Sequence, residues 1–233
     1  STDSTISCAS CHGLKTGGVD NKQYSEGIRG QKGGVNAPSV YNAFFNFVQF
    51  WDGRAANLAE QAAQPPLNPV EMGCESFDEI IERLEADEEF SSRFKAVYPE
   101  GITELTITDA IAEYEKTLIT PSRFDAYLRG DSSALSAEEI EGYELFKKFD
   151  CATCHVGKNI GGQSYEKFSL HGDYYSDRAY RVSDATLNVE DNGRYKQTGL
   201  DYDKNRFKVP SLRNVELTYP YMHDGTIQDL SEV

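Results

Sequence analysis

Two short stretches of this sequence share one cysteine and histidine spacing, Cys8-Ala9-Ser10-Cys11-His12 and Cys151-Ala152-Thr153-Cys154-His155. Each is a C-x-x-C-H motif, the signature with which c-type haem is attached. The two thiols can add to the vinyl groups of the porphyrin, and the adjoining imidazole can bind the iron. We therefore expect two covalently bound haems, one held by Cys8, Cys11 and His12 and the other by Cys151, Cys154 and His155.

Zinc binding or dithiol redox chemistry would be the alternative for either motif. A zinc site needs a second pair of ligands, and the only further histidines in the sequence are His171 and His223. A redox dithiol of the thioredoxin kind is expected near a βαβ pattern, which these motifs lack. Haem attachment is therefore the favoured interpretation of both motifs.

The charge and hydropathy of the chain restrict its partners. The formal net charge is −15 at pH 7, which excludes nucleic acid as a natural partner because such binding depends on basic side chains that neutralise phosphates. The same field could attract a basic redox protein, or it could simply keep the surface soluble. No run of 18 apolar residues is present, so we expect no membrane span. Because c-type haem is normally assembled outside the cytoplasm, we expect an exported, periplasmic protein whose leader has been removed.

Three reactive side chains lie outside the motifs. Cys74 has no partner once the haems take the other four cysteines, and we expect a small half-buried hydrophobic residue rather than a redox group. His171 has no assignable role and is expected at the surface. His223 is expected to be a structural, hydrogen-bonded histidine near a haem.

Three helices are expected to position the motifs. A capping box at Ser76–Glu79 begins a helix with apolar residues at helical spacing from 77 to 84, in a region that ends at Pro99 and Gly101. A second helix is expected from about residue 106, with its apolar stripe formed by Ile107, Ile111, Tyr114 and Leu118, and it stops before Pro121. The third helix opens with a capping box at Ser136–Glu139 and leads directly into Cys151.

The rest of the pattern indicates two domains. Residues 156–209 are expected to be mostly irregular, because glycine pairs and turn residues recur there. We find no repeat beyond the two haem motifs, and the turn at residues 130–133 is the expected boundary. The predicted fold is mainly α, with long irregular loops and two cytochrome c-like domains, residues 1–130 and 131–233, that carry one covalent haem each.

The segment after the first motif contains groups suited to peroxide chemistry. It holds the only tryptophan, Trp51, and then Gln61, Pro65 and Glu71. A carboxylate near a haem can accept a proton from one peroxide oxygen and return it to the other, and burial would raise its pKa. A neighbouring amide could orient the peroxide. From residue types alone, a solvated or capping Glu71 and a core Trp51 remain the commoner alternatives.

Five segments, in order along nearly the whole chain, resemble the bacterial dihaem cytochrome c peroxidase family. They are Gly33–Ala43 (G-G-V-N-A-P-S-V-Y-N-A), Phe50–Ala55 (F-W-D-G-R-A), Asn68–Met72 (N-P-V-E-M), Val209–Val215 (V-P-S-L-R-N-V) and Pro220–Gly225 (P-Y-M-H-D-G). The resemblance implies a peroxidatic N-terminal haem and a high-potential C-terminal haem that receives electrons. Their proximal ligands would be His12 and His155.

The resemblance also implies roles for the other site residues. Glu71 would be the acid–base residue and Gln61 its distal companion, while Phe50 and Pro65 would shape the pocket and Trp51 would lie between the haems. A calcium ion would be held at the domain interface by the side chain of Asn36 and the carbonyls of Thr218 and Pro220, oxygen ligands of the kind that calcium favours.

The chain departs from the family pattern in the loop before Gly33. Many members have a histidine there, which caps the peroxidatic iron in the resting oxidised enzyme. Ile28 takes that place, and no histidine lies between His12 and His155. We therefore predict no histidine cap from this loop and an open or water-bound His12 iron. Either the enzyme needs no reductive activation or another group closes the site.

A second departure concerns the ends of the sequence. The family's high-potential haem takes a distal methionine from a segment beyond His-Asp-Gly, whereas this sequence has no methionine after Met222. Met222 lies inside the matched motif and is a poor candidate for that ligand. The helix expected before Ser1 is also absent. We expect the sequence to be part of a longer protein, truncated at both ends.

The predicted function is reduction of hydrogen peroxide to water, with electrons from a small periplasmic cytochrome c or cupredoxin. Electrons would arrive at the His155 haem and pass by way of Trp51 to the His12 haem. The alternatives are a related dihaem oxygenase that acts on a protein substrate and a non-enzymatic dihaem electron carrier. Family members are often dimers, so a homodimer is compatible with the resemblance.

Overall fold

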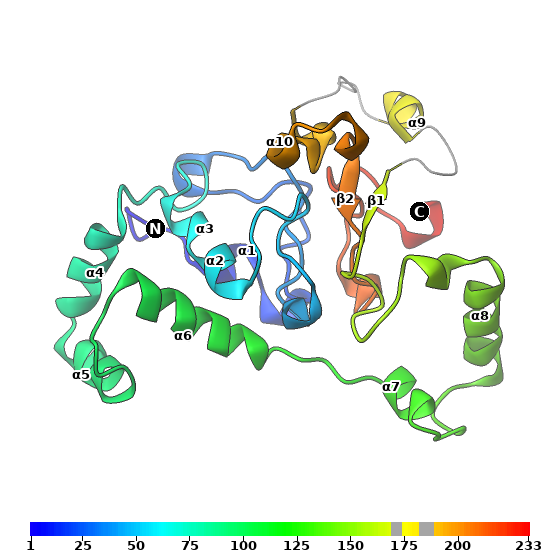
Figure 1. The fold of residues 1–233 in the computed structure, drawn as a ribbon, viewed down its shortest axis with the longest axis horizontal. Helices are drawn as coiled ribbons and strands as arrows, with labels where there is room; N and C mark the ends of the chain where they lie inside the picture. Colours follow the sequence, from blue (N-terminus) through cyan, green and yellow to red (C-terminus); the bar gives the residue numbers. More distant parts are fainter. Residues whose placement is uncertain (169–173, 182–188) are drawn as a thin grey trace.

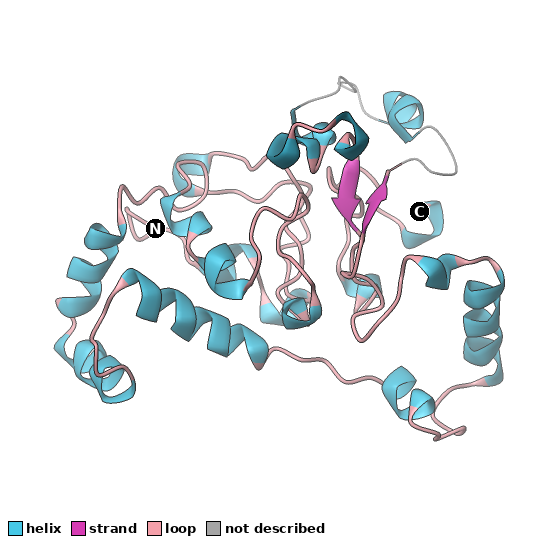
Figure 2. Cartoon of the chain, viewed as in Figure 1, coloured by secondary structure: helices cyan, strands magenta, loops and turns pink. Residues whose placement is uncertain are grey.

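The computed structural model describes residues 1–168, 174–181 and 189–233, and this part of the chain is mainly helical with one two-stranded sheet (Figures 1 and 2). The mainly α prediction is confirmed. The helices are α1 (Cys8–Cys11), α2 (Leu58–Ala62), α3 (Gln64–Leu67), α4 (Phe77–Glu85), α5 (Glu88–Val97), α6 (Glu104–Lys116), α7 (Arg123–Leu128), α8 (Ala137–Lys148), α9 (Tyr174–Arg181) and α10 (Tyr195–Thr198). Strands β1 (Tyr165–Lys167) and β2 (Arg206–Lys208) pair antiparallel, with Tyr165 opposite Lys208.

Side-chain caps begin the helices that the capping boxes predicted. Ser76 Oγ accepts a hydrogen bond from the Glu79 amide at 3.4 Å at the start of α4. Ser136 Oγ accepts one from the Glu139 amide at 3.2 Å at the start of α8. The first predicted helix is in fact two helices, because Asp87 caps the Phe90 amide at 2.9 Å and starts α5. Both capping predictions are confirmed.

Helix α6 packs on the core with only part of the stripe that was expected, since Ile107 and Ile111 belong to a core cluster. Ile107 is buried, but Tyr114 is 56% exposed, and Leu118 lies beyond the end of the helix at Lys116. The predicted stripe was wrong at these two positions. The small residue Ala112 takes part in the core instead, in a cluster with Ala43 and Leu58, because a small side chain lets α2 approach α6 closely.

Helices α6, α7 and α8 run along one edge of the molecule and connect its two halves (Figure 1). Arg213 anchors α7 to the C-terminal half with two hydrogen bonds to Asp125, at 2.7 and 3.0 Å. The guanidinium holds the pKa of Asp125 well below its usual range. Helix α8 then leads through Asp150, in a left-handed conformation with φ of 59°, into the short helical turn Cys151–Thr153. The predicted delivery of the chain from this helix into Cys151 is confirmed.

The structure contains an internal repeat that the sequence analysis missed. Segments 38–55 and 210–227 have the same succession of backbone conformations, with left-handed residues at Asn42 and Asn214, at Phe50 and Met222, and at Gly53 and Gly225. Each segment ends in an isolated bridge, between residues 49 and 55 and between residues 221 and 227. The statement that no repeat exists beyond the haem motifs was therefore wrong. The available signal was the pattern P-S-x-x-N at residues 38–42 and 210–214, followed at the same spacing by D-G at residues 52–53 and 224–225.

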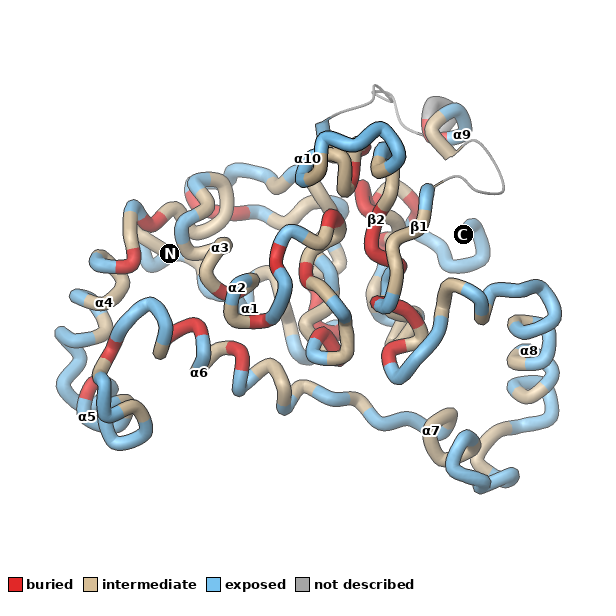
Figure 3. The backbone as a smooth tube through the Cα atoms, in the orientation of Figure 1, coloured by how far each residue is buried: buried red, intermediate tan, exposed pale blue. Residues whose placement is uncertain are grey.

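The residue two positions before each repeat segment joins the other segment at the centre of the molecule, and the two hydrogen bonds are reciprocal. The amide of Asn36 donates to the carbonyl of His223 at 2.8 Å, and the amide of Lys208 donates to the carbonyl of Trp51 at 2.8 Å. Asn36 corresponds to Lys208 in the repeat, and Trp51 corresponds to His223. Both segments carry buried residues where they meet (Figure 3). We call this contact the junction.

Residues 156–209 contain more regular structure than expected. Their described part includes β1, α9, α10 and β2, so the prediction of a mostly irregular stretch was too strong.

No helix of the described residues is long and apolar enough to cross a membrane.

Candidate functional site

The histidines of the two C-x-x-C-H motifs share one hydrogen-bond arrangement. His12 Nδ1 lies 3.3 Å from the carbonyl of Gly18, and His155 Nδ1 lies 3.3 Å from the carbonyl of Ile160. A carbonyl partner assigns the proton to Nδ1 and leaves the Nε2 lone pair for a metal. Burial lowers the pKa of both imidazoles, which favours the neutral form that ligates iron.

The thiols of the motifs complete a donor set that fits two c-type haems. Cys8, Cys11, Cys151 and Cys154 are all free and at least partly accessible. The backbone also repeats, since His12 and His155 donate their amides to the first cysteine of each motif at 2.9 and 3.0 Å. The fifth cysteine, Cys74, is buried, and burial raises the pKa of its thiol, as expected for a packing residue. His171 lies outside the described residues.

Glu71 is a half-buried carboxyl whose environment suits proton transfer. Burial raises its pKa above the usual range for glutamate. The side-chain amide of Asn68 donates to Glu71 Oε1 at 3.0 Å, and the backbone of Asn68 is tied to the carbonyl of Gln64 on α3 at 3.1 Å. This leaves Glu71 Oε2 without a hydrogen bond to the described residues. The structure thus holds Oε1 of the carboxyl in place and leaves Oε2 available to accept a proton.

Arg54 is a residue of this region that the sequence analysis missed. Its guanidinium lies 3.4 Å from the centroid of the Phe50 ring and donates to Gln64 Oε1 at 2.8 Å and to Asp52 Oδ1 at 3.1 Å. Its charge lowers the pKa of Glu71 and so opposes the effect of burial. The motif W-D-G-R was the available signal, but it does not reveal that the arginine lies close enough to Glu71 to lower the pKa of its carboxyl.

Substituting Arg54 by Gln is expected to raise the pKa of Glu71 further. The substitution removes the positive charge that favours the carboxylate, while burial remains. The carboxyl stretching band of Glu71 can be followed against pH by infrared difference spectroscopy, with Glu71→Gln as the reference that lacks the band. Arg29→Gln removes the same charge at an exposed position and should leave the titration in place. A titration that does not move in Arg54→Gln would contradict the electrostatic coupling.

Two other predicted pocket residues lie on neighbouring short helices. Gln61 is half-buried on α2, and Pro65 is half-buried on α3; Figure 1 shows the two helices next to each other. The side chain of Gln61 makes no hydrogen bond to the described residues, so the amide that orients Glu71 is that of Asn68. The roles of Gln61, Pro65 and Phe50 toward a bound peroxide stay predictions.

Ile28 is locked against the segment that carries Glu71. It is 2% exposed, and its amide donates to the carbonyl of Glu71 at 2.8 Å. The preceding glycine permits this contact, since a Cβ atom at Gly27 would lie 1.9 Å from the carbonyl oxygen of Val70. Gln31 adds a hydrogen bond to the carbonyl of Pro69 at 2.9 Å. The loop thus packs on the Glu71 segment through the buried side chain of Ile28, and its correspondence to the family's capping histidine stays a prediction.

Trp51 lies half-buried at the junction. Its Nε1 donates to the carbonyl of Asn36 at 2.9 Å. Its ring meets those of Phe207 and His223 edge to face, with centroids 6.3 and 6.4 Å apart. The structure therefore places Trp51 between the two halves of the chain, and its part in electron transfer stays a prediction.

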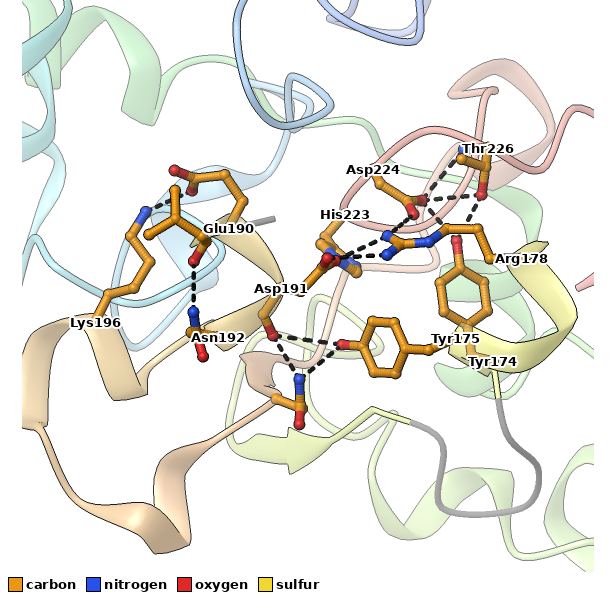
Figure 4. A network of polar contacts seen from close by, with 12 residues as sticks. Tyr174, Tyr175, Arg178, Glu190, Asp191, Asn192, Lys196, His223, Asp224 and Thr226 are labelled. Carbon is orange, nitrogen blue, oxygen red and sulfur yellow. Dashed lines mark hydrogen bonds and ion pairs between the residues drawn. The ribbon is translucent and has the colours of Figure 1, made fainter. Parts of the chain in front are cut away.

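A buried polar network surrounds His223 (Figure 4). His223 Nε2 lies 2.8 Å from Asp191 Oδ1, which confirms a structural, hydrogen-bonded histidine. Arg178 of α9 contacts both Asp191 and Asp224 at 2.9 Å. The two aspartates and His223 are close enough together to hold a metal ion, but the guanidinium already supplies the cation between the carboxylates. The network was missed because its members are far apart in sequence.

The predicted calcium ligands have oxygens that suit the ion. Asn36 donates its side-chain amide to the carbonyl of Lys22 at 3.0 Å, which leaves Oδ1 without a hydrogen bond from the described residues. The carbonyls of Thr218 and Pro220 accept none from this part of the chain either. Such a donor set fits calcium, and the site stays a prediction.

Comparison with known proteins decides the family. Residues 1–133 match the family described as di-haem cytochrome c peroxidase. The chain belongs to this family. Family membership implies two haems, in agreement with the two C-x-x-C-H motifs, although their covalent attachment and the calcium ion remain predictions.

Individual members of the family are similar to nearly the whole chain. The chain is 52% identical to cytochrome c peroxidase Ccp of Escherichia coli over 231 residues, which are 99% of this chain and 48% of that protein. It is 47% identical to cytochrome c551 peroxidase of Nitrosomonas europaea over 97% of this chain and 65% of that protein. A solved structure of a MauG-like protein associated with microbial copper homeostasis superposes with a TM-score of 0.84 at 29% identity, covering all of this chain and 70% of that one. The chain thus spans about half to two thirds of the length of these two peroxidases.

Proposed function

We propose that this chain forms the dihaem unit of a periplasmic cytochrome c peroxidase, which reduces hydrogen peroxide to water with electrons from a small cytochrome c or cupredoxin. Family membership supports the reaction class. The observation that carries the proposal is Glu71, a half-buried carboxyl with a raised pKa and with one oxygen that makes no hydrogen bond to the described residues. An electron carrier would need no such group.

The proposed proton chemistry uses the free oxygen of Glu71. A bound haem supplies the iron that binds peroxide and delivers the electrons. Glu71 Oε2 accepts the proton from one peroxide oxygen and returns it to the other, which leaves as water. Asn68 keeps Oε1 in place during the transfer, and Gln61 orients the peroxide. Two electrons and two further protons complete the conversion of one peroxide into two waters.

The proposed electron path crosses the junction. Residues 131–233 form the domain of the His155 haem, which receives electrons, and residues 1–130 form the domain of the His12 haem, where peroxide reacts. The similar backbone of segments 38–55 and 210–227 supports two cytochrome c-like domains. Trp51 connects them, because it contacts Phe207 and His223 of the other half. We also propose that a calcium ion binds to Asn36, Thr218 and Pro220. The protein would act as a homodimer.

Peroxide turnover by the haem-loaded, full-length protein tests this function. We expect hydrogen peroxide to be consumed with stoichiometric oxidation of a reduced cytochrome c. Because Ile28 replaces the capping histidine, we also expect turnover by the fully oxidised protein without prior reduction, and a resting spectrum with an open or water-bound His12 iron. Peroxide consumption without donor oxidation would favour the dihaem oxygenase. No consumption by either oxidised or half-reduced protein would refute the peroxidase.

A further inference from the structure

A buried lysine at the junction has no acidic partner among the described residues. Lys208 is 7% exposed, and its ammonium makes no hydrogen bond or ion pair with this part of the chain. Burial lowers its pKa to about 8, and no carboxylate contributes an opposing effect. A buried ammonium is costly unless an anion compensates it. The chain therefore places a positive charge where its own described residues provide no negative one.

The position of Lys208 relates it to the second haem motif. Lys208 ends β2, and its amide donates to the carbonyl of Trp51 at 2.8 Å. The chain then continues past Val209, whose amide donates to the carbonyl of Ser164 at 3.0 Å, to Pro210, whose backbone raises the pKa of the His155 imidazole. Lys208 is thus hydrogen-bonded to the backbone of Trp51 and lies two residues before Pro210, which is close to the predicted iron ligand His155.

The internal repeat gives an independent reason to expect a cation here. Lys208 corresponds to Asn36, the predicted calcium ligand, and both residues make the reciprocal hydrogen bonds of the junction. The carbonyls that correspond to Thr218 and Pro220 are those of Asn46 and Val48, and they too accept no hydrogen bond from the described residues. Asn36 is therefore predicted to bind a calcium ion. At the corresponding place in the other half, Lys208 supplies an ammonium group of the chain itself.

We propose that Lys208 pairs with a propionate of the haem attached at Cys151 and Cys154 and raises the reduction potential of that haem. A propionate is the carboxylate that a haem brings into such a site, and a nearby positive charge favours the form of the haem that holds one more electron. The inference rests on the two-haem part of the proposed function and does not depend on peroxide turnover. It makes Lys208 a positioning and tuning residue rather than a catalytic one.

Spectroelectrochemical titration of the haem-loaded protein tests the proposal. Lys208→Met and Lys208→Gln remove the charge and are expected to shift the redox equilibrium of the His155 haem at least tenfold toward the oxidised form, about 59 mV for one electron. Lys208→Arg keeps the charge and should stay close to the unsubstituted protein. Lys167→Met removes the same charge from an exposed position on the paired strand and is the matched control.

Several results would overturn the proposal. An unchanged potential in both neutral variants would show that Lys208 does not face the haem. An equal shift in Lys208→Arg would indicate packing rather than charge, and an equal shift in Lys167→Met would indicate a general surface effect. If Lys208→Met fails to fold, Lys208→Gln and Lys208→Arg still decide between charge and packing. A protein that shows the expected shift but consumes no peroxide would refute the proposed function alone.

Discussion

Replacing Glu71 by Gln is expected to lower kcat for hydrogen peroxide reduction by about 10²- to 10⁴-fold, the usual contribution of a positioned acid–base group. Gln has nearly the same shape and keeps an oxygen that can accept the hydrogen bond from Asn68, which spans 3.0 Å in the structure. The substitution therefore removes the proton-transfer group with little change in packing. Steady-state oxidation of a reduced cytochrome c measures the loss, and the haem content shows whether both haems are still attached.

The pH profile provides a second readout of the same residue. Glu71 must be deprotonated to accept a proton, so activity should fall as pH decreases through its pKa. Burial raises that pKa, which places the acid limb of kcat/KM above about pH 4.3, the ordinary value for glutamate. Glu71→Gln should abolish this limb together with most of the activity. A limb that survives the substitution would assign the titration to another group.

Glu115 is the matched control for Glu71. It is a half-buried carboxyl in the N-terminal half, on α6, and burial raises its pKa to about 7. It lies near the thiol of Cys8, whose pKa its charge raises, and no amide among the described residues holds it as Asn68 holds Glu71. Glu115→Gln should keep most of the turnover. If this variant lost activity and Glu71→Gln kept it, the acid–base role would belong to Glu115.

Replacing Arg178 by Met is expected to destabilise the folded protein by about 3–5 kcal/mol, the cost of breaking a buried ion pair from one side. Arg178 is 3% exposed, and Asp191 and Asp224 are each 2% exposed. Without the guanidinium, two buried carboxylates would lie close together beside His223 and the hydroxyl of Tyr174. Denaturant unfolding of the haem-loaded protein measures the change in the free energy of unfolding.

An exposed ion pair is the control for this prediction. Arg93 and Glu89 pair at 3.7 Å on α5 with both side chains over 80% exposed, so Arg93→Met should leave the free energy of unfolding nearly unchanged. The loss in Arg178→Met should be accompanied by a change in the surroundings of His223, which shares Asp191 with the arginine. A loss no larger than that of Arg93→Met would show that the network does not stabilise the fold.

The parts of the site that could be predicted are those formed by residues close together in the sequence. A C-x-x-C-H motif places two thiols and an imidazole on a single turn, so the haem attachment points could be read without knowledge of the fold. The same holds for the helix starts at Ser76 and Ser136, because a capping side chain and its amide partner are three residues apart. The apolar stripe of α6 was less predictable, since it depends on how closely α2 approaches.

The environment of Glu71 shows what sequence reasoning could not reach. The motif indicated a carboxyl near a haem, but not that Asn68 holds one of its oxygens or that the charge of Arg54 offsets the effect of burial. These effects depend on side-chain direction and on the amount of water excluded. Both are properties of the folded chain.

By itself, the sequence determined that this protein has two haem attachment motifs, a mainly helical fold and a candidate acid–base carboxyl beside the first motif. Only the tertiary structure decided that segments 38–55 and 210–227 form one repeated backbone, that the two halves meet through the backbone of Asn36 and Lys208, and that Arg178 closes a buried network around His223. The physical reason is distance along the chain. Local motifs act through bonds to near neighbours, whereas the junction and the buried charges join residues whose proximity exists only after folding.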